Sequence, residues 1–263
     1  MQIRLGIPAS FPRFTKASAE LGAPILISAN ALRKSHGYPG FRSIAPDMFS
    51  GCDVALDSAG FVAMVRYGGY LWTTADYVSL AKSHPWAWWA AMDYCCEPEI
   101  APDRFEVMKR VRDTVRHLKI CQEEAERQNV KPPMPVLQGW KATDYVQCFD
   151  WMLSLPLPDL LGLGSVCRRQ LGGEDGLLAI VARLDRELPP AKKLHLFGVK
   201  GTAVAALAGH PRIHSIDSMA WDLAARRTCG DHSNSVDYRI SHMRRWYEAN
   251  VALLNQPQLR MAV

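Results

Sequence analysis

The sequence predicts a single (β/α)₈ barrel of the TIM type, followed by a C-terminal amphipathic helix. Its 263 residues match the usual length of one such barrel. Short apolar runs of strand length alternate with helical patterns along the whole chain. No glycine-rich phosphate-binding turn follows an early strand, as it would in the rival open, doubly wound sheet. We therefore expect one domain over residues 1–263.

Eight apolar runs are the expected strands of this barrel. Several are continuous aliphatic stretches without polar alternation, which is typical of strands that are buried on both faces of a parallel sheet. The eight runs are Ile3–Ile7, Pro24–Asn30, Val54–Asp57, Ala87–Asp93, Pro135–Gly139, Leu160–Gly164, Leu194–Val199 and His214–Asp217.

The segments between these runs carry helical periodicity. The clearest is Asp103–Asn129, whose apolar residues recur at spacings of three and four, and whose Asp103 and Glu106 resemble a capping box. We also expect helices over Glu174–Leu188, over Thr202–Leu207 with Thr202 as N-cap, and over Val236–Leu254, which is the C-terminal amphipathic helix.

Composition restricts the class of protein. With 48% apolar and 22% charged residues, the chain is that of an ordinary globular protein. Residues 1–20 lack the apolar region of a signal peptide, and no apolar run reaches the roughly 18 residues of a membrane span. Seven cysteines, an odd number scattered partly within apolar runs, indicate free thiols in a reducing compartment. We expect a cytoplasmic protein whose net charge of +5 permits a nucleic-acid partner without requiring one.

Three of the apolar runs end in a carboxylate, at Asp57, Asp93 and Asp217. In a barrel, these strand ends all emerge at the C-terminal mouth, where such folds hold their active sites. A lone Asp at a strand end is more often the N-cap of the next helix. Three of them, together with Gln138 and glycine-containing turns at successive strand ends, indicate a functional mouth, since an unpaired buried Asp costs several kcal/mol.

The strand-end motifs resemble those of the tRNA-guanine transglycosylases, in family order over residues 54–220. Asp57-Ser58-Ala59-Gly60-Phe61 resembles the family's Asp-Ser-Gly-Gly-Phe, with Ala59 in place of one glycine, and Asp93 with Cys95 resembles its base-recognising Asp and nearby Cys. The remaining motifs are Gln138-Gly139-Trp140 for Gln-Gly-Gly, Leu163-Gly164-Ser165-Val166 for Ile-Gly-Gly-Leu, Phe197-Gly198-Val199 for Met-Gly-Val, and Ile216-Asp217 for Phe-Asp.

This resemblance implies a role for each motif. Asp217 would attack C1′ and hold the sugar covalently, while Asp57 would move the proton of the departing and arriving bases, so that two displacements retain the β configuration. Asp93 would accept hydrogen bonds from a guanine-like face. The expected remainder of the base site is Ser58, Phe61, Gln138, Gly139, Gly164, Ser165, Phe197 and Gly198, with Phe61 and Phe197 stacking on the ring. No cofactor is implied, because the covalent intermediate conserves the energy of the glycosidic bond.

One family feature is missing from this chain. The tRNA enzymes carry a Cys-x-Cys-x-x-Cys zinc site and a later His, whereas this tail offers only Cys229, His232 and His242, three ligands where four are needed. We expect no metal. The chain is therefore more similar to the branch of phages and bacterial modification clusters that exchanges guanine in DNA for a 7-deazaguanine such as preQ0, in a bacterial or phage-infected cell.

Three alternatives stay open at this point. The chain could act on tRNA, or it could be a hydrolytic glycosidase or nucleosidase on the same barrel. It could also be a barrel that only binds nucleic acid within a larger modification complex, although three carboxylates facing an anionic partner argue against a pure binder. The resemblance also allows a homodimer and accessory DNA-modification proteins, and it implies no membrane.

A nucleic-acid substrate imposes demands on the mouth. The target nucleotide must be flipped out or single-stranded, because C1′ of a stacked nucleotide cannot reach carboxylates deep in a barrel. Trp140 and Trp221 follow strand ends and are candidates either for wedges or for core packing. The residues expected to bind phosphates are Arg168, Arg169, Lys200, Arg226 and Arg227.

Overall fold

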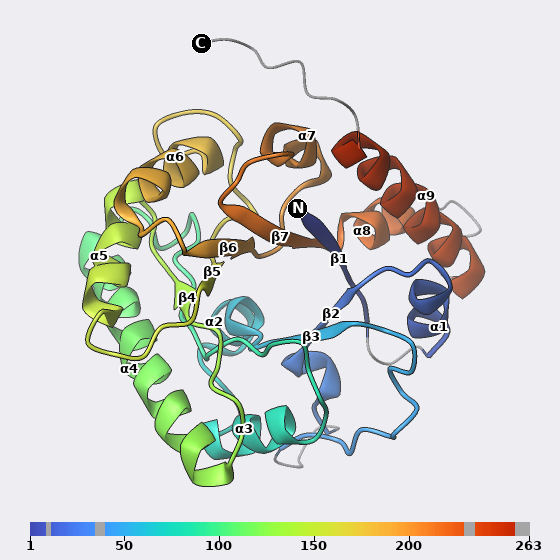
Figure 1. Ribbon diagram of the computed structural model, residues 1–263, viewed down its shortest axis with the longest axis horizontal. Coiled ribbons are helices and arrows are strands. Elements are labelled where there is room, and N and C mark those ends of the chain that lie inside the picture. The colour runs from blue at the N-terminus through green and yellow to red at the C-terminus, as the bar shows by residue number, and fades with distance from the viewer. Residues whose placement is uncertain (9–11, 35–39, 229–234, 256–263) are drawn as a thin grey trace.

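The computed structural model describes residues 1–8, 12–34, 40–228 and 235–255, and in these residues one parallel sheet curls around a central axis with helices outside it (Figure 1). The sheet has seven strands in the order β3-β2-β1-β7-β6-β5-β4. The strands are β1 (Gln2–Gly6), β2 (Ile25–Ser28), β3 (Val54–Asp57), β4 (Val136–Leu137), β5 (Leu160–Leu163), β6 (Lys193–Leu196) and β7 (Ile213–Ser218).

The expected closed barrel of eight strands is wrong at one element. The run Ala87–Asp93 forms no strand, and it lies between β3 and β4 through isolated parallel bridges from Trp89 to Leu56 and from Ala90 to Met134. Met134 donates its N–H to the Trp89 carbonyl at 2.8 Å and accepts the Ala91 N–H at 2.9 Å, but no second bridge joins these two segments in the described residues. The result is a curled, seven-stranded α/β sheet with a TIM-like arrangement.

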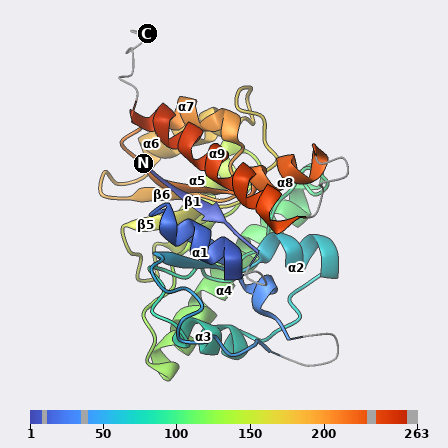
Figure 2. The ribbon, with the colours of Figure 1, turned by 90° about the vertical axis from the view of Figure 1, so that its right-hand side faces the viewer.

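Most of the helices cover the outer face of this sheet, whereas α2 (Gly60–Tyr67) lies inside their ring in the view of Figure 1, at one end of the sheet (Figure 2). The other helices are α1 (Pro12–Glu20), α3 (Thr74–Lys82), α4 (Arg104–Gln128), α5 (Ala142–Met152), α6 (Leu177–Glu187), α7 (Val204–Leu207), α8 (Ala220–Arg227) and α9 (Val236–Asn255), with 3₁₀ turns η1 (Ala29–Leu32) and η2 (Gly201–Ala203). None of the helices in the described residues is long and apolar enough to cross a membrane.

The helix ends follow the sequence signals in part. Asp103 caps α4 as expected, because its side chain accepts the Glu106 N–H at 3.0 Å, and Asn129 ends the helix in the left-handed conformation. The expected helix Thr202–Leu207 divides instead into η2 and α7, so Thr202 is not an N-cap. The C-terminal helix α9 packs on α8, α7, α1 and β1, which confirms it as part of the fold.

Because the strands are parallel, their carboxyl ends meet at one end of the molecule, where α2 and α8 lie (Figure 2). Below this mouth, the interior is filled by a small apolar cluster that includes Met134, Val136 and Phe197. Gly162 makes room for that packing, since a Cβ there would lie 2.7 Å from the Phe197 ring. Phe197 is thereby part of the floor of the mouth.

Candidate active site

Three carboxylates lie close together at the mouth. Asp57 ends β3, Asp93 ends the bridged segment, and Asp217 lies in β7. Burial, with the negative charges of Asp93 and Asp217 acting in the same direction, raises the pKa of Asp57 to about 7, and the Ala59 N–H, 3.1 Å from Oδ2, opposes the shift. Asp57 therefore changes its protonation state near neutral pH, as a group that exchanges protons must.

Asp93 is held on both of its carboxylate oxygens. Ser58 Oγ donates to Oδ1 at 2.6 Å, and Gln138 Nε2 donates to Oδ2 at 2.5 Å. The Tyr70 hydroxyl donates to the Asp93 carbonyl at 2.8 Å and accepts its N–H at 2.9 Å. Burial raises the pKa of Asp93, and the hydrogen bonds from Ser58 and Gln138 counteract that shift. The carboxylate is an acceptor fixed in place before any ligand arrives.

The turn after β5 orients the Gln138 amide. Ser165 Oγ donates to Gln138 Oε1 at 2.6 Å and accepts the Cys96 N–H at 2.7 Å. The Gln138 side chain lies across Gly164, where an added Cβ would lie only 2.2 Å from its Nε2. With its oxygen occupied by Ser165, the amide must direct its nitrogen toward Asp93.

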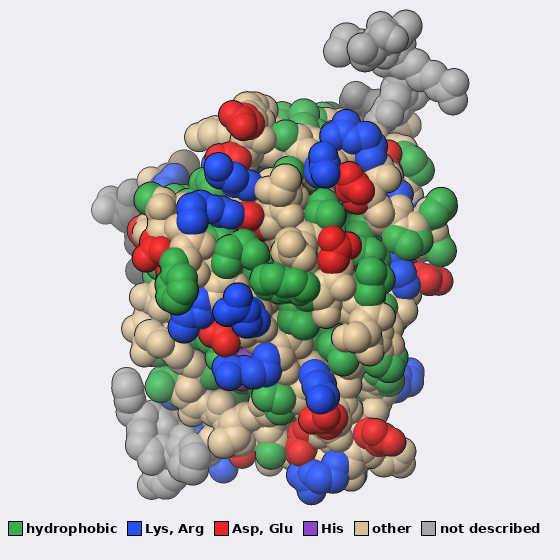
Figure 3. Space-filling model, turned by 90° about the vertical axis from the view of Figure 1, so that its left-hand side faces the viewer, with side chains coloured by type: hydrophobic (Ala, Val, Ile, Leu, Met, Phe, Trp, Pro, Cys, Tyr) green, Lys and Arg blue, Asp and Glu red, His purple; other side chains and the backbone are tan. Residues whose placement is uncertain are grey.

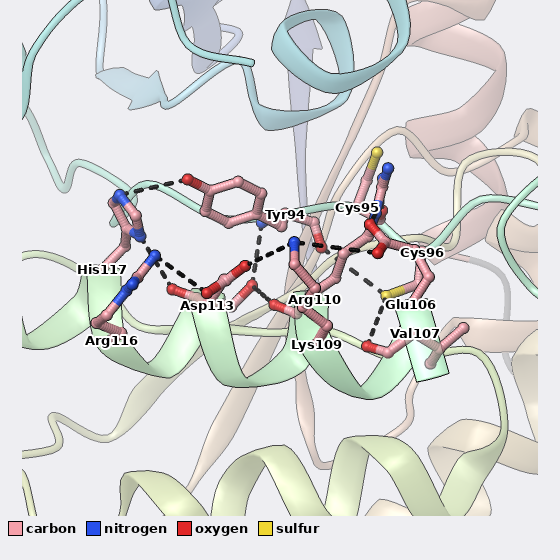
Figure 4. Close-up of polar contacts among 11 residues, drawn as sticks. Tyr94, Cys95, Cys96, Glu106, Val107, Lys109, Arg110, Asp113, Arg116 and His117 are labelled. Atoms are coloured by element: carbon pink, nitrogen blue, oxygen red, sulfur yellow. Dashed lines mark hydrogen bonds and ion pairs between the residues drawn. The ribbon is translucent and has the colours of Figure 1, made fainter. Parts of the chain in front are cut away.

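Helix α4 anchors the segment that follows Asp93 (Figure 4). Arg110 Nη1 donates to the Cys95 carbonyl at 2.7 Å, and Thr114 Oγ1 accepts the Tyr94 N–H at 3.0 Å. The Cys95 side chain points away from α4 in Figure 4. Burial raises the pKa of its thiol to about 12, with Asp93 adding to the shift, so Cys95 stays a neutral thiol and is no candidate nucleophile.

Asp217 is only 6% exposed, and its two oxygens have different surroundings. Oδ1 accepts the Gly198 N–H at 2.9 Å, and His195 Nε2 lies 3.3 Å from the same oxygen. Gly198 has φ +67°, and an added Cβ would lie 2.7 Å from Cys167 Cβ, so only glycine fits this turn. Oδ2 accepts no hydrogen bond from the described residues.

This arrangement contains the parts that displacement of a glycosidic bond requires. Asp217 offers a free carboxylate oxygen, Asp57 offers a carboxyl that titrates near neutral pH, and Asp93 offers a fixed acceptor for N–H groups. Two carboxylates, one attacking and one exchanging protons, are the groups that retaining glycosidases use for the same bond.

The aromatic and glycine residues expected at the site occupy distinct places. Phe61, on the first turn of α2, is 38% exposed and free to contact a ligand. Phe197 packs edge-on against Trp88 and His195 in the floor. Gly139 allows α5 to approach, because a Cβ there would lie 2.6 Å from Asp144 Cβ.

Of the expected phosphate contacts, Arg169 is the buried one, at 6% exposure. Its guanidinium donates to the main-chain carbonyls of Ser165 and Asp175, at 2.9 and 2.6 Å, and lies 4.0 Å above the Trp140 ring. Arg169 thus supports the Ser165 turn, and Trp140 supports Arg169.

The other four expected cations are exposed. Arg168 pairs with Glu99 at 2.7 Å, and Arg226 pairs with Asp222 at 2.9 Å. Lys200 follows β6, and Arg227 ends α8 at the same end of the molecule. The flank formed by α4 and α5, by contrast, mixes basic, acidic and apolar side chains without one continuous basic surface (Figure 3).

Two further expectations concern a stacking residue and a metal. Trp221 is fully buried and its Nε1–H donates to the Gly6 carbonyl at 3.2 Å, so it is a core residue. Cys229 and His232 lie outside the described residues, and His242 packs on the Tyr238 ring in α9. Within the described part of the chain, no group of three or more His, Cys, Asp or Glu residues could hold a metal ion.

Two residues that the sequence does not mark as site residues contact Asp93 and Asp217, namely Tyr70 and His195. Tyr70 reaches Asp93 from the segment after α2, and no pattern in the sequence indicates that contact. His195 in β6 lies two positions before Phe197, the residue that directly follows the strand, so alternation along an extended chain directs both side chains to the same side. That signal was present, but an imidazole in an apolar run is ordinarily a core residue.

Comparison with known proteins identifies a family to which this chain is similar. Residues 21–258 match the family described as DpdA: DeoxyPurine in DNA protein A, a span that includes all three carboxylates. No curated protein matches the chain significantly.

Proposed function

The chain belongs to the DpdA family, whose activity is DNA modification by exchange of guanine and a deazaguanine, and on that premise we propose a specific reaction for it. It replaces guanine in DNA with a 7-deazaguanine of the preQ0 type, through a covalent bond between Asp217 and C1′. The observation that carries this proposal is the grouping of Asp57, Asp93 and Asp217 at one mouth, with Oδ2 of Asp217 free.

The first displacement removes guanine. Asp217 Oδ2 attacks C1′ as the bond from C1′ to N9 breaks, and protonated Asp57 donates its proton to the departing base. Positive charge develops on the sugar in this transition state, and the carboxylates surrounding it stabilise that charge. The product is a sugar bonded to Asp217 and a neutral free guanine.

The second displacement reverses these events with a different base. The 7-deazaguanine gives its N9 proton to ionised Asp57 and attacks C1′, and the bond to Asp217 breaks. Two inversions retain the β configuration, and the protein ends with Asp57 protonated and Asp217 ionised, as it began. No external energy source is required, since one glycosidic bond replaces another.

Asp93 is the proposed recognition group for both bases. Its carboxylate accepts hydrogen bonds from the ring N–H and exocyclic amine that guanine and 7-deazaguanine share. Ser58 and Gln138 hold the carboxylate in place for this purpose, and exposed Phe61 stacks on the ring. The shared face explains how one site binds the departing and the arriving base.

DNA reaches this site with its target nucleotide flipped out. We assign the phosphate contacts to the exposed cations at the mouth, which are Arg168, Lys200, Arg226 and Arg227. Arg169 is not among them, because its donors are already engaged by main-chain carbonyls.

The test is base exchange by the purified protein, with labelled guanine or mass-detected preQ0 offered with DNA or with unmodified tRNA at low salt. We expect incorporation into DNA, none into tRNA, and no continued release of guanine when no acceptor base is present. Incorporation into tRNA alone would overturn the substrate. Sustained release of guanine without an acceptor would show a hydrolase, and no exchange into either would contradict the activity of this chain.

A further inference from the structure

A histidine lies directly beneath Asp217, inside the curled sheet. His195 is in β6, is fully buried, and packs between the rings of Trp88 and Phe197, each with its centroid 4.7 Å away. Burying an imidazole among aromatic rings is unfavourable unless its nitrogens have polar partners. The polar partners of the two ring nitrogens therefore indicate the role of His195.

Each nitrogen faces one polar side chain of the neighbouring strand β7. Nδ1 lies 2.8 Å from Ser215 Oγ, and Nε2 lies 3.3 Å from Asp217 Oδ1, where it makes no hydrogen bond in the structure. Burial lowers the pKa of His195, Asp217 opposes the shift, and Arg4 and His214 add to it, so the ring is neutral. A neutral ring has one N–H, and a Ser215 hydroxyl that donates to Nδ1 leaves that N–H at Nε2, facing Asp217.

Building on the proposed function, we infer that His195 is a positioning residue for Asp217. The Gly198 N–H holds Oδ1 in the structure, and the proposed donor at Nε2, 3.3 Å from the same oxygen, restrains it from the other side, which leaves the free oxygen Oδ2 for C1′. Ser215 keeps the imidazole in the form that has this donor. His195 itself touches neither base nor sugar.

The same contact acts on the second displacement. An N–H donor stabilises a carboxylate more strongly than the carbonyl oxygen of the sugar ester, because the carboxylate is charged. The donor therefore favours departure of Asp217 when the new base attacks. Without it, the covalent intermediate persists longer, and we expect exchange to slow by about 10- to 100-fold, the loss typical of one hydrogen bond to a charged group.

Two substitutions of His195 distinguish the contribution of its Nε2 from that of its Nδ1. In His195→Gln the amide nitrogen can occupy the place of Nε2, whereas in His195→Asn it can reach only the place of Nδ1. The control is His214→Gln, an exposed histidine in β7. The measurements on the full chain are the exchange rate, the KM for DNA, and the fraction of protein joined to DNA after a denaturing quench.

We expect His195→Asn to exchange 10- to 100-fold more slowly, with an unchanged KM and a larger joined fraction, and His195→Gln to behave nearly as the wild type. Damage to the fold would lower the fraction of protein joined to DNA. A fall in both the exchange rate and the joined fraction of His195→Asn would therefore overturn the inference. Equal behaviour of His195→Asn and His195→Gln would overturn it as well. If His195→Asn does not fold, Ser215→Ala serves in its place. We expect Ser215→Ala to raise the joined fraction, and the absence of a rise would contradict the role of His195.

Different results would refute the covalent mechanism and the role of His195. Exchange by the wild type with no protein joined to DNA would refute the covalent mechanism itself. A joined wild type that matches His195→Asn in every measurement would leave that mechanism in place and refute the role of His195 alone.

Discussion

At the scale of single residues, three aspartates of one chemical type differ because their surroundings differ. Asp57 is buried beside two other carboxylates, and its pKa rises to about 7. Asp93 receives a hydrogen bond on each oxygen, from Ser58 and Gln138. Asp217 receives the Gly198 N–H on one oxygen only. These surroundings suit the three to proton exchange, recognition and attack, respectively.

The raised pKa of Asp57 predicts a pH dependence for guanine release in a single turnover. Departure of the base needs protonated Asp57, which is the dominant form below about pH 7 and is lost as the pH rises through that value. The release rate should therefore fall about tenfold per pH unit above pH 7. Asp57→Asn should lower the rate by roughly 10²- to 10⁴-fold and remove the slope.

Rapid-quench measurement of free guanine checks this prediction, with Asp159→Asn as the control, since Asp159 precedes β5 at the opposite end of the sheet and is 75% exposed. A release rate in the wild type that is constant from pH 6 to 9, or a slope that persists in Asp57→Asn, would assign the proton to another group.

At the scale of elements, the turn from β3 to α2 positions two of the carboxylates at once. Ala59 has φ +68°, the left-handed conformation that glycine adopts without strain. The next residue, Gly60, lies against Asp93, where an added Cβ would be 2.5 Å from Oδ1. The departure from the family motif at Ala59 therefore leaves the turn intact, and the glycine that Asp93 requires is the one retained.

Gly60→Ala is expected to displace Asp93 and weaken recognition of the base. A displacement of about 1 Å can cost roughly 100-fold in rate, so we predict a loss of that order in kcat/KM for both bases. The matched control is Gly69→Ala, where an added Cβ meets no atom within 4 Å. Equal activity of the two variants in the exchange assay would contradict the role of this close contact.

Ala59→Gly is expected to stabilise the protein. Relief of the left-handed strain, about 1–2 kcal/mol, exceeds the entropic cost of glycine, so the free energy of unfolding should rise by about 0.5–1 kcal/mol. Ala63→Gly, in the interior of α2, should lower it by about 1 kcal/mol. Urea unfolding monitored by tryptophan fluorescence compares the two, and destabilisation by both would show that Ala59 is unstrained.

At the scale of the whole molecule, local patterns predicted most of the fold and the three carboxylates. The run Ala87–Asp93 has the composition of a strand, but its pairing depends on two segments distant in sequence, around Leu56 and Met134, and each contact is a single bridge. Pairing between segments far apart in sequence cannot be read from either one alone. The same holds for Tyr70, which reaches Asp93 across the mouth, and for Arg169, whose charge is visible in the sequence but whose carbonyl partners are not.

Binding of DNA should depend on the cations at the mouth and not on those at the opposite end. Lys200→Gln combined with Arg227→Gln should weaken DNA binding for all sequences and reduce the slope of log Kd against log salt by about 2. The control replaces Lys82 and Lys131, two exposed lysines at the amino-terminal end of the sheet, by Gln. Fluorescence anisotropy measures the Kd for DNA over a range of salt concentrations. An equal change in the slope of log Kd against log salt in both double variants would show that DNA does not bind preferentially at the mouth.

The most direct measurement of the central claim is to map the covalent intermediate. The wild-type protein is mixed with DNA in the absence of an incoming base, quenched in denaturant, digested, and analysed by mass spectrometry for a peptide that carries a deoxyribose. We predict that the modified residue is Asp217, and that Asp217→Asn yields no such peptide. A sugar on any other residue, or a joined species that persists in Asp217→Asn, would contradict the assignment of Asp217 as the nucleophile.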